Sequence, residues 1–232
     1  MSAALAEALN PAVFWEYRAI LLKGLAFNFY VFACAAAAAL ILGLGAALLR
    51  VNRWRALRWA GTLHVEIFRN APDYVMVVWI HFVLPLLLGL AIGRRLEFPP
   101  FLSAVIALGL VYSGYFAETF RAGIQSIPLG QIEAGRACMP ERLILWRVIL
   151  PQVVRRVLPE AVNQFVSLFK ATTIVSLIAV PDLMYQVSMV TQQEMRPLPL
   201  YTGAALTYFA IVFLAASLVR AAAERWRQKV YA

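Results

Sequence analysis

Lys170 is the charged side chain of this sequence whose position most needs an explanation. It lies about a dozen residues into an apolar segment, in the stretch SLFKATTIVSL, and Thr172, Thr173 and Ser176 follow it closely. No acidic residue stands three or four positions away from it. A charge at the centre of a bilayer costs about 2.5–3.5 kcal/mol on insertion scales, so the lysine needs a cavity, an acid on another helix or an anionic ligand. The pattern favours the lining of a solute pathway.

Two further charged groups lie near the ends of apolar segments. The stretch HVEIFRNAPDY contains Glu66, Arg69 and Asp73, and a later segment ends with Glu118 and Arg121. Residues three apart share one face of a helix, so each Glu and Arg can form an ion pair. Because long side chains near a membrane surface can reach water, structural pairing is the first interpretation and contact with a solute is the second.

Motifs of catalysis are missing from the sequence. It contains no HExxH, GxSxG or GxxxxGKS stretch and no cluster of residues with metal-ligand spacing. His64 and His81 lie in apolar surroundings and are expected to be packed polar residues. The sequence therefore predicts no catalytic residues, no cofactor and no metal site, and the energy for any work must come from a partner.

The composition places these residues in a membrane protein. Of 232 residues, 62% are hydrophobic and 14% are charged, against roughly 45–50% and about 25% in soluble domains. A membrane crossing needs about 20 apolar residues. We therefore predict an all-α integral membrane fold with five transmembrane helices, at Ala26–Leu49, Thr62–Leu90, Pro100–Phe120, Leu158–Val180 and Tyr201–Val219.

Basic residues predict the orientation. If the loops after the first and third spans and the C-terminal end are cytoplasmic, that side carries fourteen basic residues and the other side five. Arginine and lysine accumulate on the cytoplasmic side, so we expect the N-terminus outside and the C-terminus in the cytoplasm. On this basis residues 1–23 form an outer interfacial segment, residues 24–221 the transmembrane domain and residues 222–232 a cytoplasmic tail. Cys34 and Cys138 fall in different environments, and a disulfide between them is not expected.

The cytoplasmic insert at residues 124–152 has a pattern of its own. QIEAGRAC and RLILWRVIL each predict a short helix, Met139-Pro140-Glu141 separates them, and Pro151 is expected to end the second. We expect Ala134 and Gly135 to form an exposed tip. The base is expected to be anchored against the bundle by Leu143, Leu145, Trp146 and Ile149. Such an insert suits docking to another protein. A helical loop without a partner is the alternative.

Several blocks of the sequence resemble one family. EAGRACMPERLILWRVILP, VEIFRNAP, YFAETFRAGIQSIPLGQIEAG and VNQFVSLFKATTIVSLIAV occur in the order seen in polar amino-acid permease subunits of bacterial ATP-binding-cassette (ABC) importers. The likeness runs from about residue 24 to the C-terminus and implies a MetI-like fold in the inner membrane. It also implies an ATP-binding subunit in the cytoplasm, a second permease subunit, identical or paralogous, and an extracytoplasmic amino-acid-binding protein.

The resemblance also implies roles for individual residues. The insert looks like the family's two-helix EAA coupling loop, which would contact the ATPase through Glu133, Ala134, Gly135 and Arg136. The substrate pathway would involve the residues Lys170, Thr172, Thr173, Asp73, Glu66 and Arg69. ATP hydrolysis is expected in the partner and not in this chain.

The sequence departs from the family pattern at three places. The glycine expected between Cys138 and Met139 is missing, Ala171 stands where an acid usually follows the lysine, and Asp73 replaces an apolar residue. The segment FRNAPDYVMVVWIHFVLP looks similar to that of glutamate/aspartate-type permeases, and a lysine without that acid suits an anionic solute. The resemblance therefore favours glutamate or aspartate as the solute. A membrane scaffold that recruits a cytoplasmic partner without transport is the alternative function.

Overall fold

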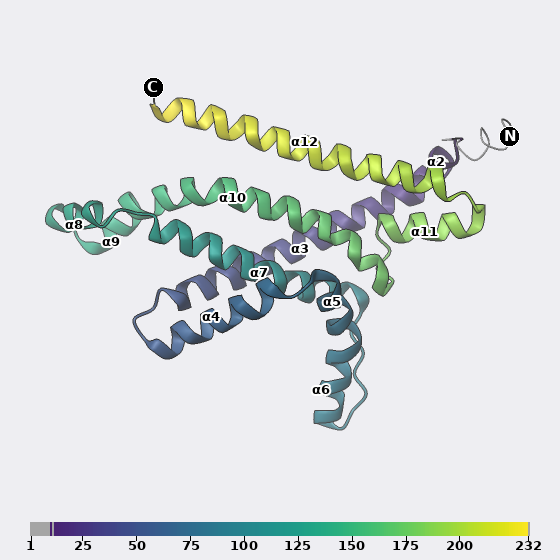
Figure 1. Cartoon of the computed structure of the whole chain (residues 1–232), viewed down its shortest axis with the longest axis horizontal. Helices are drawn as coiled ribbons and strands as arrows, with labels where there is room; N and C mark the ends of the chain where they lie inside the picture. Colours follow the sequence, from purple (N-terminus) through teal and green to yellow (C-terminus); the bar gives the residue numbers. More distant parts are fainter. Residues whose placement is uncertain (1–9, 11, 232) are drawn as a thin grey trace. The chain divides into compact units, whose positions relative to one another are not determined.

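The computed structural model describes residue 10 and residues 12–231, with side chains described as far as residue 218. This part of the chain is helical and contains no strand (Figure 1). Its elements are α2 (Ala12–Glu16), α3 (Arg18–Arg50), α4 (Arg55–Asn70), α5 (Asp73–Val78), η1 (Trp79–Val83), α6 (Leu84–Ile92), α7 (Pro100–Gln125), α8 (Leu129–Cys138), α9 (Glu141–Ile144), η2 (Leu145–Ile149), α10 (Leu150–Ala171), η3 (Thr172–Ile178), α11 (Leu183–Glu194) and α12 (Pro197–Tyr231).

Five helical stretches of the described residues are long and apolar enough to cross a membrane. They are Arg18–Arg50, Asp73–Ile92, Pro100–Gln125, Glu141–Ile178 and Pro197–Leu218. The predicted number of spans and the all-α class are therefore confirmed. Residues 18–23, which the sequence analysis assigned to an outer interfacial segment at residues 1–23, form the first turns of α3. Residues 1–9 and 11 of that segment lie outside the described residues.

The predicted bounds of the second span are wrong. The helix is interrupted at Ala71, which has extended backbone with φ −77° and ψ 132°, and a new helix starts at Asp73. The cause is Pro72, whose ring disfavours helical backbone in the residue before it. Glu66 and Arg69 consequently lie on α4, outside the apolar stretch.

The predicted helix end at Pro151 is also wrong. The helical stretch runs from Glu141 to Ile178 without a break, and Pro151 lies in the first turn of α10. Immediately before it, η2 is a π-helical turn in which Leu150 N–H donates to the carbonyl of Leu145. Proline has no N–H and crowds the preceding turn, and a local π turn lets a helix absorb such a residue.

Two compact units make up the chain and are described separately. One consists of residues 1–35, 72–108 and 166–232, and the other of residues 36–71 and 109–165. In the first unit, α11 packs against the beginning of α12 and against η3, and α5 also packs against η3 (Figure 1). Its core consists of Val13, Leu21, Leu183, Val187, Val190, Leu200 and Ala204.

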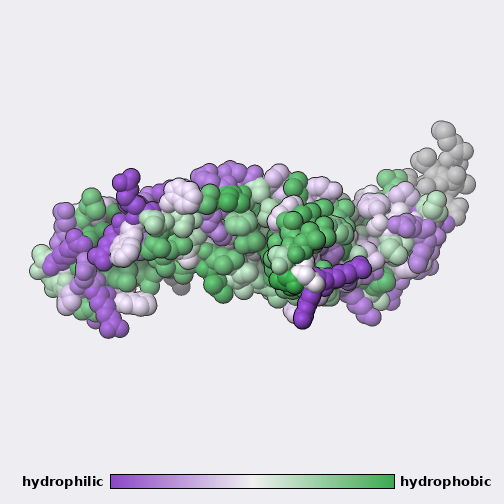
Figure 2. Space-filling model, turned by 90° about the horizontal axis from the view of Figure 1, so that it is seen from below, coloured by the Kyte–Doolittle hydropathy of each residue, from purple (hydrophilic) through white to green (hydrophobic). Residues whose placement is uncertain are grey.

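The second unit is held together by small residues. Its core contains Ala46, Ala47, Val65 and Ala117. Gly61 of α4 is buried, and a Cβ there would lie 2.9 Å from the carbonyl oxygen of Ala46. Close approach of helices through small residues is the usual packing mode where lipid gives no hydrophobic drive to associate. Large apolar side chains such as Ile41 and Phe213 remain exposed, and the surface in Figure 2 is correspondingly apolar over wide areas.

Candidate functional site

The predicted coupling residues lie on α8. Glu133, Ala134 and Arg136 are exposed, but Gly135 is buried, so the prediction that Gly135 forms part of an exposed tip is wrong. A Cβ at Gly135 would lie 3.2 Å from Cγ2 of Ile144, which is itself buried on α9. The glycine therefore lets the two short helices pack closely.

Two polar contacts hold α8 against the helical segments that follow it. Arg136 of α8 and Glu141 of α9 form an ion pair of 3.1 Å. The amide of Gln152 on α10 donates to the side-chain oxygen of Gln131 on α8 over 2.9 Å. α8 is thus tied to both helical segments that follow it.

The turn between α8 and α9 needs no glycine. Met139 has φ −155° and ψ 157°, and Pro140 has φ −60° and ψ 148°. Both values lie in the extended region that ordinary residues adopt. Met139 N–H still donates to the carbonyl of Gly135 over 2.9 Å, and this bond completes the last turn of α8.

Most of the apolar side chains predicted to anchor the insert are exposed, and only Ile149 among them is half-buried. Ile144 is buried, whereas Leu145 and Trp146 are 47% and 57% exposed. Ile144 is thus the buried apolar side chain of α9, packed against Gly135 of α8. The leucine and the tryptophan leave an apolar surface beside the exposed charges of α8.

The predicted pathway residues are divided between the two units. Asp73, Lys170, Thr172 and Thr173 belong to the first unit, where η3 packs against α5, which begins at Asp73. Glu66 and Arg69 belong to the second unit, on α4.

Lys170 lies at the end of α10, where the chain tightens into the 3₁₀ helix η3. Its side chain is exposed and takes part in no ion pair of the described residues. The hydroxyl of Thr173 donates to the carbonyl of Lys170 over 2.8 Å, and the hydroxyl of Ser176 donates to the carbonyl of Thr173 over 3.0 Å. η3 ends the helical stretch that began at Glu141, and 3₁₀ turns are frequent at the C-terminal ends of helices.

Thr172 points the other way, into a buried polar cluster that the sequence analysis missed. The amide of Asn28 on α3 donates to Oγ1 of Thr172 over 3.1 Å and to Oδ2 of Asp182 over 3.2 Å. Its oxygen accepts from Leu183 N–H over 3.0 Å and from the hydroxyl of Tyr208 over 3.1 Å. We call Asn28, Thr172, Asp182 and Tyr208 the Asn28 cluster.

Burial makes this cluster rigid. Asn28, Thr172 and Asp182 have no exposed surface, and they connect α3, η3 and the N-terminus of α11. The other oxygen of Asp182 caps α11 by accepting from Tyr185 N–H over 2.8 Å. Burial raises the pKa of the Asp182 carboxyl to about 6. An asparagine inside an apolar span was the available signal, since polar residues there are seldom without a role.

The two predicted Glu/Arg pairs have different outcomes. Glu118 and Arg121 form the expected ion pair, and Arg50 of α3 adds a second guanidinium on the same carboxylate. Glu66 does not pair with Arg69 among the ion pairs of the described residues; it accepts from the side-chain amide of Asn70 over 3.0 Å. The last turn of α4 thus replaces the predicted pair with an amide contact.

Both histidines bond to serines on α7. His64 lies 2.7 Å from the hydroxyl of Ser113, and His81 lies 2.9 Å from that of Ser103. They are packed polar residues, as predicted. Within the described residues, no three His, Cys, Asp or Glu side chains are grouped as a metal site would require.

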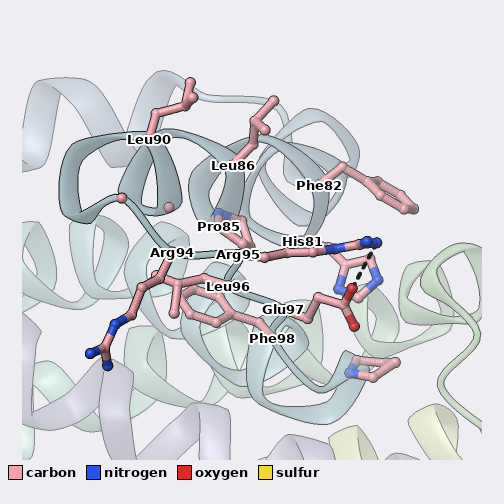
Figure 3. A pocket seen from close by; sticks show the side chains of 13 residues that line it. His81, Phe82, Pro85, Leu86, Leu90, Arg94, Arg95, Leu96, Glu97 and Phe98 are labelled. Carbon is pink, nitrogen blue, oxygen red and sulfur yellow. Dashed lines mark ion pairs between the residues drawn. The ribbon is translucent and has the colours of Figure 1, made fainter.

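A cavity of about 890 Å³ lies between α6 and the segment that returns to α7. In Figure 3, Phe82, Leu86 and Leu90 follow one another along the helix, and Arg95 reaches Glu97, with which it forms an ion pair of 3.0 Å. None of the predicted pathway residues lines this cavity.

Comparison with known proteins identifies the family. Residues 39–228 match the family described as binding-protein-dependent transport system inner membrane component. The chain belongs to this family. The resemblance found in the sequence blocks is thereby confirmed, and the five apolar helices are those of a multi-pass membrane component.

Several relatives of this chain are named as permease proteins of transport systems. It is 34% identical to the arginine ABC transporter permease protein ArtQ of Escherichia coli, over 80% of this chain and 87% of the relative. It is 31% identical to the probable glutamine ABC transporter permease protein GlnM of Bacillus subtilis, over 88% and 91%. It is 32% identical to the octopine transport system permease protein OccM of Rhizobium meliloti, over 90% and 86%.

Solved structures support the same fold. The crystal structure of an amino acid ABC transporter with histidines matches with a TM-score of 0.83 and 26% identity, over 93% of this chain and 98% of that one. An inward-facing structure of the MetNI methionine ABC transporter matches with a TM-score of 0.66 and 19% identity, over 89% and 97%. The second match shows the fold alone, which is the MetI-like fold that the sequence blocks implied.

Proposed function

We propose that this chain is the permease subunit of an ABC importer for polar amino acids. The observation that carries the proposal is the near full-length similarity to permeases named for arginine, glutamine and octopine. The chain would work with a cytoplasmic ATP-binding subunit, a second permease subunit and an extracytoplasmic amino-acid-binding protein. ATP hydrolysis in the partner would drive the exchange between outward and inward access.

The complex itself provides the first test. The purified chain should bring an ATPase with it, and a cognate binding protein loaded with amino acid should stimulate ATP hydrolysis in vesicles. A membrane scaffold would recruit a partner without any amino-acid dependence. Stable assembly without solute-dependent hydrolysis or uptake would therefore contradict the transport proposal.

We propose α8 and α9 as the element that contacts the ATPase. Glu133, Ala134 and Arg136 are exposed there, and Trp146 adds apolar surface to the same insert. Exposed apolar side chains beside charged ones are the composition expected of a protein contact. Glu133→Arg should weaken ATPase binding, and Gln125→Arg, on an exposed residue of α7, is the matched control.

We propose Lys170 as the residue of this subunit that attracts an anionic group of the solute. Its exposed ammonium has no ion-pair partner among the described residues, and the hydroxyl of Thr173 lies on the next turn. The pathway segment would also include Asp73, on the helix that packs against η3. Thr172 is buried, so its contribution would be to hold this segment in place.

A comparison of two lysine substitutions tests the proposed role of Lys170 in the pathway. Lys170→Met should lower uptake at least about tenfold and leave assembly intact, because a lost charge contact in a desolvated site costs more than 1.4 kcal/mol. Lys23→Met makes the same chemical change at an exposed position of α3 and should leave uptake unchanged. Equal uptake by the two variants would rule out the pathway role of Lys170.

Glu66 and Arg69 form a second proposed polar group on the pathway. Both side chains are exposed at the end of α4, and the amide of Asn70 fixes Glu66. Arg69→Gln should change the apparent affinity for solute if this group meets it. A change in the stability of the protein without a change in the apparent affinity for solute would show that Glu66 and Arg69 contribute to packing only.

Glutamate or aspartate is the finer proposal for the solute. An exposed lysine without the acid that usually follows it favours a second carboxylate on the substrate. The importer should then transport acidic amino acids faster than glutamine or arginine, as measured with the cognate binding protein. Uptake of basic but not acidic amino acids would refute this choice.

We also propose that the chain has its N-terminus outside and the insert in the cytoplasm. Cys138 is exposed on α8 and offers a native probe, whereas Cys34 is half-buried in α3. A membrane-impermeant maleimide should label Cys138 in inverted vesicles and not in intact cells. Labelling in intact cells would reverse the orientation.

A further inference from the structure

The stretch RWRALRW, residues 53–59, places three arginines and two tryptophans at the beginning of α4. The arginines, Arg53, Arg55 and Arg58, are exposed, and none of them takes part in an ion pair of the described residues. Arg50, a few residues earlier, is different because it pairs with Glu118. The stretch therefore offers three guanidinium groups to a ligand outside the chain.

The two tryptophans are as exposed as the arginines. Trp54 is 62% exposed and Trp59 is 68% exposed. An indole ring has a large apolar body and one N–H donor, and tryptophan is enriched at the level of lipid headgroups because that region satisfies both. Alternation of these rings with guanidinium groups within one short stretch matches the interface of a membrane rather than bulk water.

Packing of α4 against α3 holds this surface in place. Gly61 and Val65 are buried, and a Cβ at Gly61 would lie 2.9 Å from the carbonyl oxygen of Ala46 and from Cβ of Leu49, both on α3. Only four residues separate the end of α3 from the start of α4. The arginines and tryptophans therefore lie immediately beyond the end of the first apolar span, where lipid headgroups are expected.

We propose that residues 53–59 bind the headgroups of anionic phospholipids. Guanidinium groups bind phosphate oxygens in a bidentate geometry, and a row of basic residues directly after a span is attracted to an acidic leaflet. The tryptophan rings enter the boundary between headgroups and acyl chains. The assignment to the cytoplasmic leaflet uses the proposed orientation, but binding itself does not depend on which solute is carried.

Lipid retention by the whole importer tests the site. The complex with its ATPase is reconstituted in phosphatidylcholine vesicles with or without phosphatidylglycerol, repurified, and analysed by native mass spectrometry for bound phosphatidylglycerol. Each of Arg53→Gln, Arg55→Gln and Arg58→Gln should weaken retention about fivefold, as expected for one basic residue at an acidic surface. The same positions changed to lysine should retain most of the binding.

Two controls make the outcome decisive. Arg94→Gln removes an exposed arginine at the other end of the second span and should leave retention unchanged. Trp54→Ala and Trp59→Ala should each reduce retention of both lipids, because the rings contact acyl chains rather than the charge. A further variant changes all three arginines to glutamine and should lose the most retention; if it does not assemble, the single variants carry the test.

Three results would overturn the proposal. Unchanged phosphatidylglycerol retention in the glutamine variants would exclude the headgroup contact. An equal loss of phosphatidylglycerol retention in the Arg94→Gln control would show that retention depends on the net charge of the protein and not on residues 53–59. Release of the ATPase from these variants in detergent without lipid would assign the surface to a protein partner instead. Absence of amino-acid transport by the same complex would contradict the proposed function and leave the lipid result intact.

Discussion

The Asn28 cluster and the α8–α9 insert use polar residues in opposite ways. In the cluster, one asparagine joins α3, η3, α11 and α12, and every bond is made inside the protein. In the insert, the charges of Glu133 and Arg136 are exposed beside apolar Trp146. The polar groups of the cluster are satisfied within the protein, whereas the insert keeps exposed charged and apolar surface that is available to a partner.

The energetics of the two regions differ accordingly. Buried hydrogen bonds that are fully satisfied fix one arrangement, and leaving a member without its partner costs about 1–3 kcal/mol. The exposed ion pair of Arg136 and Glu141 belongs to a class that contributes about 0–1 kcal/mol. We infer that substitutions in the cluster act on stability, while substitutions in the insert act on coupling.

The largest effect on stability is expected from Asn28→Leu. Leucine lacks the amide N–H groups that donate to Thr172 and Asp182, and it lacks the oxygen that accepts from Leu183 N–H and the Tyr208 hydroxyl. The free energy of unfolding should therefore fall by about 2–4 kcal/mol. Denaturant titration of the detergent-purified protein measures it. A loss below about 0.5 kcal/mol, the usual range of surface substitutions, would contradict the role of the cluster.

Asp182 gives the cluster a dependence on pH. Burial raises the pKa of its carboxyl from 3.8 to about 6 in the folded protein, so between these values the folded state binds more protons than the unfolded state. Stability should therefore be highest below pH 4 for this group and should fall as the pH rises to about 6. Unfolding midpoints across this window, compared with Asp182→Asn, isolate the contribution. A wild-type profile parallel to that of the variant would refute it.

Gly135→Val tests the insert. A side chain there meets Ile144 at 3.2 Å, so α8 and α9 must move apart, yet the free energy of unfolding should change by less than about 2 kcal/mol because both helices are short and largely exposed. Solute-stimulated ATP hydrolysis should fall by about tenfold or more, since displaced contacts at a protein interface lower the coupling. Ala137→Val, at an exposed position of the same helix, is the control. Normal stimulation in Gly135→Val would show that the spacing of the two helices is not needed.

Thr191→Val should have the smallest effect. The Thr191 hydroxyl on α11 is buried without a hydrogen-bond partner in the described residues, so replacing it with a methyl group of the same shape should leave stability equal or slightly higher. The variant uses the same unfolding measurement as Asn28→Leu. Destabilisation by more than about 1 kcal/mol would show that the polar network around α11 extends beyond the Asn28 cluster.

The sequence predicts the spans and the insert better than the contacts between them. Five apolar stretches and a helix pair around Met139 follow from length, hydropathy and proline, which are local signals. The break at Ala71 has a local cause in Pro72, but the sequence analysis treated residues 62–90 as one continuous span. Pro151 caused the opposite error, because a helix end was predicted where the helix continues. The π turn before it cannot be predicted from residue types.

The Asn28 cluster was out of reach for a physical reason. The partners of Asn28 lie 144 to 180 positions away from it along the chain, and their pairing is decided by how the helices pack. The same limit applies to Arg50, whose contact with Glu118 spans 68 positions, whereas the pair of Glu118 and Arg121 follows from their spacing. The burial of Gly135 likewise depends on Ile144, which lies on the far side of a turn.

The joint between α8 and α9 has one more consequence. Met139 and Pro140 both have extended backbone, and the proline ring restricts the unfolded chain as well as the folded one. A glycine in this joint would give up more conformational entropy on folding, of the order of 0.5–1 kcal/mol. The absence of the glycine that the resemblance led us to expect there therefore does not destabilise the joint. In the proposed contact with the ATPase, less of the binding free energy would then be consumed in fixing the shape of the insert.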